Sequence, residues 1–249
     1  MTTPAAQLVL HATQVHKSFD GTAVLRGVDL ELYQGQIVAL IGSSGSGKST
    51  LLRCINLLEQ VNDGQIFLGE QDITDPRINQ DEVRRNIGLV FQAYNLFAHL
   101  SVRENITLAL RKVKGIEPEA ANSRAEALLE RIGLSEQANS YPDKLSGGQQ
   151  QRAAIMRAVA LEPKVLLLDE VTSALDPELV GEVLELIREL KQQGTSIVMA
   201  THELSFARDV ADWVLFLDQG RIVEEGPAAQ VLGNPQQPRT QDFLSRLLD

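Results

Sequence analysis

Residues 37–50 read IVALIGSSGSGKST, an apolar run that leads into a glycine-rich loop. Positions 42–49 match G-x-x-x-x-G-K-[ST], the pattern of a phosphate-binding loop. Glycines let such a loop turn its backbone N–H groups toward phosphate oxygens, and the following helix adds its positive end. An ordinary Gly/Ser turn would lack the flanking strand at 37–41 and the helical apolar pattern at 51–58. The stretch therefore predicts a strand, a phosphate-binding loop and the start of a helix.

The parts of this loop have separate expected roles. Lys48 can reach the β- and γ-phosphates of a nucleotide as a point charge, and the hydroxyl of Ser49 is suited to ligate Mg2+. We expect phosphate contacts from Gly42, Ser43, Ser44, Gly45, Ser46, Gly47, Lys48, Ser49 and Thr50.

The composition of the 249 residues is typical of a soluble globular protein, with 43% hydrophobic and 22% charged residues. The net charge of -10 argues against a general nucleic-acid binder. No apolar run approaches the roughly 18 residues that cross a bilayer, and residues 1–6 lack the features of a signal peptide. We therefore expect a cytoplasmic protein, and any membrane role must go through a partner. The single cysteine, Cys54, fits a reducing compartment and is expected to be a core residue rather than a reactive thiol.

The rest of the chain predicts strands that alternate with helices. Residues 8–38 alternate apolar and polar side chains, which predicts short antiparallel strands. Uninterrupted apolar runs at 87–91, 165–168 and 197–200 predict strands buried on both faces. Further expected elements are helices at 117–133, 149–161, 176–194 and 241–248, and a hairpin over 213–223. This order indicates the α/β class with a parallel sheet.

Polar residues follow four of the predicted strands. They are the loop after 37–41, then Gln92, the pair Asp169 and Glu170, and His202. Because ligands of parallel sheets bind beyond the carboxyl ends of the strands, we expect these groups to surround a triphosphate.

Charge and reach separate the roles of these four residues. Asp169 is suited to hold Mg2+ opposite Ser49, and Glu170 to polarise an attacking water as general base. A solvated strand end or a helix cap is the alternative for this pair, and it is less favoured beside a phosphate loop. His202 can donate to the γ-phosphate, although lone histidines are often structural. Gln92 can ligate Mg2+ or contact the water, and the alternative of an exposed loop amide stays open.

Residues 145–149 read LSGGQ and precede a predicted helix. Ser146 and the two glycines expose a hydroxyl and backbone N–H groups, which indicates a second anion-binding helix N-terminus. A simple N-cap by Ser146 is the alternative, and it leaves the glycine pair unexplained. Phe19 also stands out, because aromatic residues make up only 4% of the chain, and it is either a core anchor or a ligand contact.

Together these motifs resemble the nucleotide-binding subunit of an ATP-binding cassette transporter. The resemblance rests on the phosphate loop, Gln92, the LSGGQ signature, LLLDE at 166–170, SALD at 173–176 and THE at 201–203. It implies a P-loop NTPase (RecA-like) fold, with an α/β parallel-sheet core, an antiparallel β-subdomain and an inserted helical subdomain. It further implies one domain over 8–249, in which 8–92 and 160–249 form the core and β-subdomain and about 93–159 form the helical subdomain.

The resemblance also implies the ligands and a partner. The cofactors would be ATP and Mg2+, with Phe19 stacking on adenine and Val24 nearby. The protein would form a head-to-tail dimer, most simply a homodimer, in which Asp176 contacts the opposite subunit. The signature residues of one subunit would close on the γ-phosphate held by the other; these are Ser146, Gly147, Gly148 and Gln149.

Within that family, residues 91–105 and 176–180 resemble importers for polar amino acids and related zwitterions. This implies a membrane permease as partner, an external solute-binding protein, a location on the cytoplasmic face of the membrane and no nucleic-acid ligand. Val171, Ala93 and Ala98 depart from the residues frequent in that subfamily without removing a chemical group. The alternatives are a cassette of another importer or exporter class and a soluble non-transport cassette ATPase. A P-loop kinase or GTPase would leave the signature and His202 unexplained.

Overall fold

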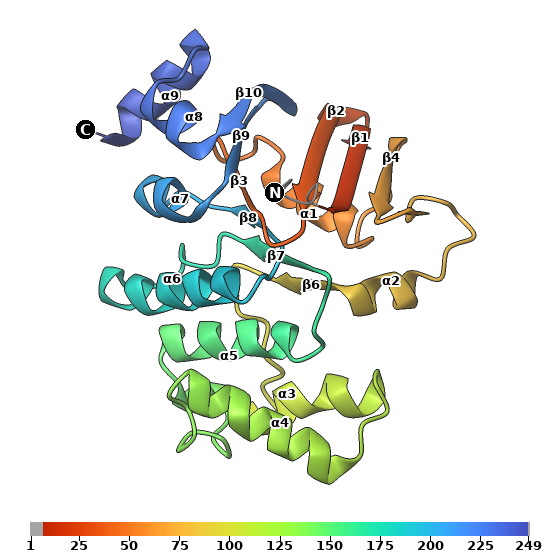
Figure 1. The fold of residues 1–249 in the computed structure, drawn as a ribbon, viewed down its shortest axis with the longest axis vertical. Coiled ribbons are helices and arrows are strands. Elements are labelled where there is room, and N and C mark those ends of the chain that lie inside the picture. The colour runs from red at the N-terminus through yellow and green to blue at the C-terminus, as the bar shows by residue number, and fades with distance from the viewer. Residues whose placement is uncertain (1–6, 249) are drawn as a thin grey trace, which may run out of the picture.

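The computed structural model describes residues 7–248. The expectation about a signal peptide concerns residues 1–6, which lie outside the described residues, as does Asp249 at the end of the expected domain. The described chain forms two sheets with helices around them (Figure 1). The expected α/β class with a parallel core is confirmed, and among the described residues no helix is both long and apolar enough to cross a membrane.

The larger sheet has the phosphate-loop strand β3 in its interior. Its order is β10 (Arg221–Pro227), β9 (Trp213–Asp218), β3 (Ile37–Ile41), β8 (Ile197–Ala200), β7 (Val165–Asp169) and β6 (Ile87–Val90). All pairings are parallel except that of the edge strand β10 with β9. Every residue of β3, β7 and β8 is buried, as expected for apolar strands covered on both faces.

The smaller sheet is antiparallel, in the order β2 (Thr22–Tyr33), β1 (Leu8–Phe19), β4 (Asp63–Leu68) and β5 (Gln71–Asp72). The expectation of short strands was wrong for β1 and β2, which run for 12 residues each. Register shifts, one of them between Ala12 and Val15, let the pairing continue across breaks in the alternating pattern. Asp20 and Gly21 both have positive φ in the turn between these strands, as a tight hairpin requires.

Nine α-helices complete the described chain. They are α1 (Lys48–Ile55), α2 (Gln80–Asn86), α3 (Val102–Lys112), α4 (Pro118–Arg131), α5 (Gly147–Val159), α6 (Pro177–Gln192), α7 (Leu204–Val210), α8 (Ala228–Gly233) and α9 (Pro238–Leu248). A 3-10 turn covers Pro142–Lys144. Helix α5 begins two residues before the expected start, because Ser146 caps it. Helix α9 begins at Pro238 rather than 241, since proline is tolerated in a first helical turn.

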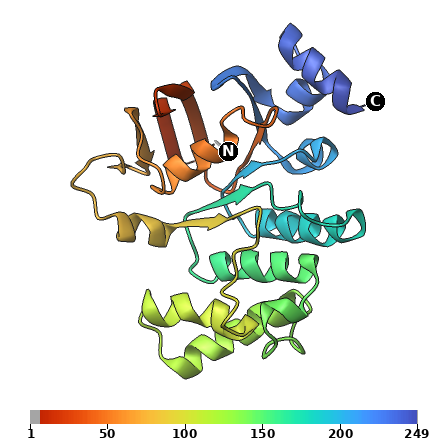
Figure 2. The same cartoon turned by 180° about the vertical axis from the view of Figure 1, so that it is seen from behind.

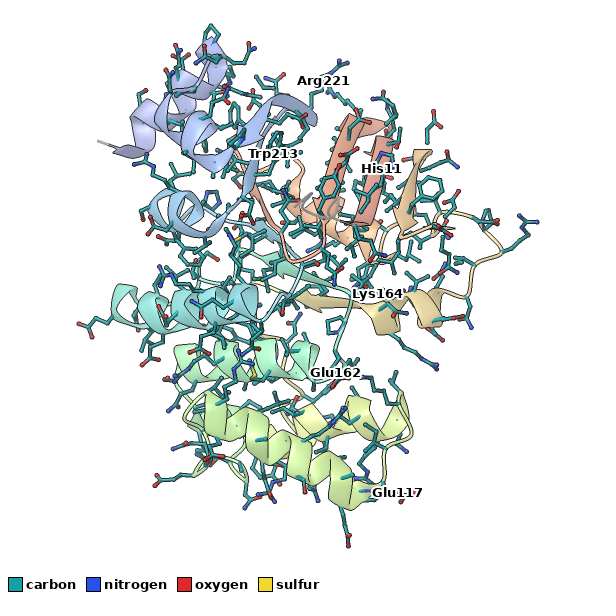
Figure 3. The ribbon with its side chains drawn as sticks, viewed as in Figure 1. His11, Glu117, Glu162, Lys164, Trp213 and Arg221 are labelled. Carbon is teal, nitrogen blue, oxygen red and sulfur yellow. The ribbon has the colours of Figure 1, made fainter. Side chains whose placement is uncertain are left out.

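The helices α3, α4 and α5 gather at one end of the molecule, and the antiparallel sheet lies toward the other (Figures 1 and 2). Glu117 before α4 and Arg221 at the start of β10 mark these two ends in Figure 3. Alternate residues of β3 enter two apolar clusters: Ile41 packs in the cluster that also holds Ile155 of α5, and Leu40 packs in the cluster that holds Leu51 of α1. The central strand is therefore fixed from both faces.

The turn between β9 and β10 is held by both sheets. The N–H of Gly220 donates to the carbonyl of Ser46 at 3.0 Å, and the N–H of Arg26 donates to the carbonyl of Gly220 at 2.9 Å. Gly220 has φ +79°, and a Cβ there would lie 2.3 Å from the carbonyl oxygen of Val24. Only glycine fits this position. Its two backbone hydrogen bonds join strand β2 to the phosphate loop.

Candidate functional site

The phosphate loop lies between β3 and α1 and depends on Gly42. Its φ is +147°, and a Cβ there would lie 2.1 Å from the carbonyl oxygen of Leu217 on the neighbouring strand β9. The loop backbone therefore lies directly against the sheet. Helix α1 begins at Lys48 with no acidic residue in its first turn, so its positive N-terminal end is not neutralised there.

A cation, a carboxylate and an imidazole meet at one oxygen atom beside the loop. The Nζ of Lys48 donates to the carbonyls of Gly42 and Ser43 at 2.9 and 3.2 Å, and it lies 3.4 Å from Oε1 of Glu170. The Nε2 of His202 lies 2.9 Å from the same Glu170 oxygen. These groups come from α1 and from the ends of β7 and β8, as expected for neighbouring parallel strands.

A second pair of oxygen donors lies next to this cluster. The hydroxyl of Ser49 donates to Oδ1 of Asp169 at 2.7 Å. Burial raises the pKa of the Asp169 carboxyl above its ordinary value, and the hydrogen bond from Ser49 partly opposes that shift. A hydroxyl beside a carboxylate is a donor set that suits Mg2+, which prefers oxygen ligands.

The backbone of Glu170 is held in an unfavourable conformation. Its φ is +48°, which is uncommon for a residue with a side chain. Its N–H donates to the carbonyl of Ala200 at 3.0 Å, and its carbonyl accepts from the hydroxyl of Ser173 at 2.8 Å. Strained residues of this kind cluster at functional sites, where their surroundings must fix them.

Lys48, Ser49 and Glu170 border a cavity of about 390 Å³, whereas Asp169 and His202 do not line it. It is lined by Phe19, Val24, Ser44, Gly45, Gly47, Lys48, Ser49, Thr50, Gln92 and Glu170. The expected base contacts and the phosphate loop therefore share one space. Phe19 is 39% exposed, so its interpretation as a core anchor was wrong. Gln92 is exposed and lines the cavity, so both of its interpretations remain.

The signature segment does not line this cavity. The hydroxyl of Ser146 accepts from the N–H of Gln149 at 3.3 Å, and the N–H of Ser146 donates to Oε1 of Gln149 at 3.0 Å, which forms a capping box. The N-cap interpretation of Ser146 is therefore confirmed. Close packing accounts for the glycine pair, since a Cβ at Gly147 would lie 2.7 Å from the Tyr94 hydroxyl and one at Gly148 would lie 3.1 Å from Leu179.

Asp176 lies directly before helix α6. It stands at the N-cap position of α6, but its side chain makes no capping hydrogen bond and is exposed. Next to it, the hydroxyl of Tyr94 donates to the carbonyl of Ala174 at 3.1 Å. Burial, and then the charge of Asp176, raises the pKa of Tyr94. Sequence reasoning missed Tyr94, because its contacts join segments that lie far apart in the chain.

Comparison with known proteins gives consistent matches. A family model described as ABC transporter matches residues 25–173. The glutamine transport ATP-binding protein GlnQ of Geobacillus stearothermophilus is 47% identical, covering 97% of this chain and 100% of its own. The L-cystine transport system ATP-binding protein TcyN of Escherichia coli is 53% identical, covering 93% and 95%. Among solved structures, the dimeric ATP-binding cassette MJ0796 bound to ADP and Pi matches with TM-score 0.78 and 32% identity, covering 88% of this chain and 98% of its own.

Proposed function

Because this chain belongs to the ABC transporter family, we propose that it is the ATP-hydrolysing subunit of an importer for a polar amino acid or a related small zwitterion. The two relatives named above are amino acid transport ATP-binding proteins, and their similarity covers nearly the whole chain. A soluble cassette ATPase or a cassette of another transporter class is less favoured for that reason.

The observation that carries the catalytic part is the meeting of Lys48, Glu170 and His202 at one carboxylate oxygen. The phosphate loop and Lys48 would hold the triphosphate, and Glu170 would take a proton from the attacking water. His202 would orient the Glu170 carboxylate and donate toward the γ-phosphate. The strained backbone of Glu170 supports this role, since it sets the carboxylate at the end of β7.

We also propose that Mg2+ accompanies the ATP. Ser49 and Asp169 would hold it, with Gln92 as a third ligand that lines the same cavity. The ion would neutralise negative charge that develops on the phosphate oxygens. The close hydroxyl and carboxylate oxygens support this assignment.

A second copy of the chain would complete the site as a head-to-tail homodimer. The partner would supply the signature residues Ser146, Gly147, Gly148 and Gln149 to the γ-phosphate. Two features support this: the segment lies outside the cavity of its own chain, and the exposed side chains of Ser146 and Asp176 are available to a partner. The dimeric form of the solved cassette supports it as well.

Mixing two inactive variants tests the dimer. Lys48→Ala removes the phosphate contact, and Ser146→Arg blocks the signature. A heterodimer would contain one intact composite site, so an equal mixture should recover about a quarter of wild-type ATP turnover. A mixture as inactive as either variant alone would count against sites shared between subunits.

An apolar groove near Gln92 supports the expected permease partner. Its volume is about 480 Å³, and Arg84, Arg85 and Arg157 stand among its apolar side chains. Phe97 and Leu58 are 44% and 48% exposed there. We propose that an apolar segment of a permease docks in this groove and holds the subunit on the cytoplasmic face of the membrane, with a solute-binding protein acting on the opposite side.

Reconstitution tests the transport function. The chain should co-purify with its permease from membranes, and proteoliposomes of that complex should take up one polar amino acid when ATP and the loaded solute-binding protein are present. Complexes with Glu170→Gln should assemble but transport at background rate. Co-purification with no membrane protein, together with ATP hydrolysis by the chain alone, would favour the soluble cassette instead.

A further inference from the structure

Lys17 and Phe19 stand two residues apart at the end of β1. The ammonium of Lys17 stands over the ring of Phe19, with Nζ 4.6 Å from the ring centroid. This distance is within the range of a cation–π contact. The side chain of Lys17 is only 11% exposed, whereas Phe19 is 39% exposed. A buried cation thus contacts a ring that reaches the surface.

The ammonium of Lys17 is fixed by two further contacts. It donates to the carbonyl of Gln60 at 2.8 Å and lies 3.1 Å from Oε2 of Glu59. Both partners lie in the segment that follows α1, the helix that begins at Lys48. The same segment is joined to β1 by Asn62, whose side-chain oxygen accepts from the N–H of Ser18 at 2.7 Å. Lys17 therefore connects the ring of Phe19 to the segment that follows α1.

The cavity contacts only one member of this pair. Phe19 lines it and Lys17 does not, so the ring contacts the cation on one side and still borders the cavity. Phe19 is the last residue of β1, before a tight turn, where an unsupported side chain has rotational freedom. Fixing such a side chain beforehand lowers the entropic cost of binding.

We infer that Lys17 is a positioning residue, which holds the Phe19 ring so that its free face stacks on the base of a bound nucleotide. This rests on the proposed function, because it takes the cavity to be the ATP site. Lys17 does not touch the phosphates, so its contribution is confined to the base.

Calorimetric binding of two probes tests this inference. ADP contains the base, and inorganic tripolyphosphate contains phosphates alone. Lys17→Met should weaken ADP binding by about three- to tenfold and change tripolyphosphate binding by less than about twofold. Lys17→Arg keeps a cation and should restore most of the ADP affinity. Lys114→Met is the matched control, because Lys114 also pairs with a glutamate at 3.1 Å, outside the site, and it should bind both probes like wild type.

The outcomes separate this inference from the proposed function. Wild-type protein that binds neither probe would overturn both. Wild-type binding with an unchanged ADP affinity in Lys17→Met would overturn only the role of Lys17, as would an equal loss for both probes, which indicates general damage. Should Lys17→Met fail to fold, Glu59→Gln loosens the same ammonium. It should show the same selective loss for ADP, and equal affinities for wild type and Glu59→Gln would overturn the inference.

Discussion

Two regions of the molecule differ in their contacts: the phosphate-loop edge, where the loop at 42–49 meets the ends of β7 and β8, and the signature segment at 145–149. Each contains a loop that leads into a helix N-terminus. At the phosphate-loop edge, Lys48, Glu170 and His202 come from separate elements and meet within 3.4 Å of one oxygen atom. In the signature segment, the side chains of Ser146 and Gln149 each accept a hydrogen bond from the other residue's backbone N–H within a capping box. The first region gathers long-range contacts, and the second forms a local structure with an exposed serine.

This difference fits the proposed dimer, in which each chain would supply one part of a shared site. A site made by long-range contacts is assembled when the domain folds. A capped helix N-terminus with an exposed hydroxyl is stable before any ligand arrives, so it can be presented to a second molecule without reorganisation. The variants below test each region and then Tyr94, which lies against the signature segment.

The largest effect is expected at the phosphate-loop edge. Glu170→Gln keeps the shape of the side chain but removes its basicity, so steady-state ATP turnover should fall by about 10²- to 10⁴-fold while ADP binding persists. Exposed Glu136→Gln is the control and should hydrolyse ATP like wild type. Turnover of Glu170→Gln near the wild-type rate would remove Glu170 from the role of general base.

The next effect is expected in the signature segment. Ser146→Ala removes the hydroxyl proposed to meet the partner's γ-phosphate, so turnover should fall by about 10- to 100-fold. It should also cost about 1 kcal/mol of stability by loss of the cap. Ser101→Ala is a matched control, because Ser101 forms the same type of capping box with Glu104 on α3. The two variants should lose similar stability in urea titrations, and only Ser146→Ala should lose activity; equal activities would reduce Ser146 to a cap.

A smaller effect is expected at Tyr94, which lies between the signature segment and Ala174. Tyr94 lies against Gly147 and donates to the carbonyl of Ala174, so Tyr94→Phe removes that hydrogen bond. We expect kcat to fall by about fivefold with little change in KM for ATP. Tyr141→Phe, at a side chain that is 51% exposed, should leave both constants unchanged. A change in KM alone would place Tyr94 in nucleotide binding instead.

The smallest effect concerns the packing behind the phosphate loop. Cys54 is buried on α1, and burial raises the pKa of its thiol to about 12. At pH 8 only about 10⁻⁴ of it would be thiolate, so iodoacetamide should label the folded protein very slowly and label it fully in urea. Labelling should rise about tenfold for each pH unit below 12. Rapid labelling at pH 8 would show that α1 unfolds locally far more often than the burial of Cys54 implies.

The sequence predicted those helices and strands whose own residues show a clear hydrophobic pattern. Strands β6, β7 and β8 were placed to within one residue, because their apolar runs have no polar interruption; β7 and β8 are buried throughout, and the edge strand β6 is partly buried. Short helices such as α7 and α8 were missed, since six or seven residues hardly establish a period.

The site followed the same rule. Residues at strand ends, such as Glu170 and His202, were found from their places in the chain. Sequence reasoning did not select Lys17 and Tyr94, because their contacts with Glu59 and Ala174 join segments far apart in the chain. Lys17 stands two residues before Phe19, and that spacing is the one signal that would have pointed to it.

The Gly220 turn has a consequence for which ligands can fit. A nucleotide in the proposed cavity would touch the antiparallel sheet with its base, at Phe19 and Val24, and the parallel sheet with its phosphates. The backbone of Gly220 bonds to Arg26 on one side and Ser46 on the other, so it sets the spacing between those two surfaces. The turn therefore sets the length of a ligand that can contact both surfaces at once. Inserting one residue there would change the length of ligand that fits between the two surfaces, although every side chain that contacts the ligand would stay the same.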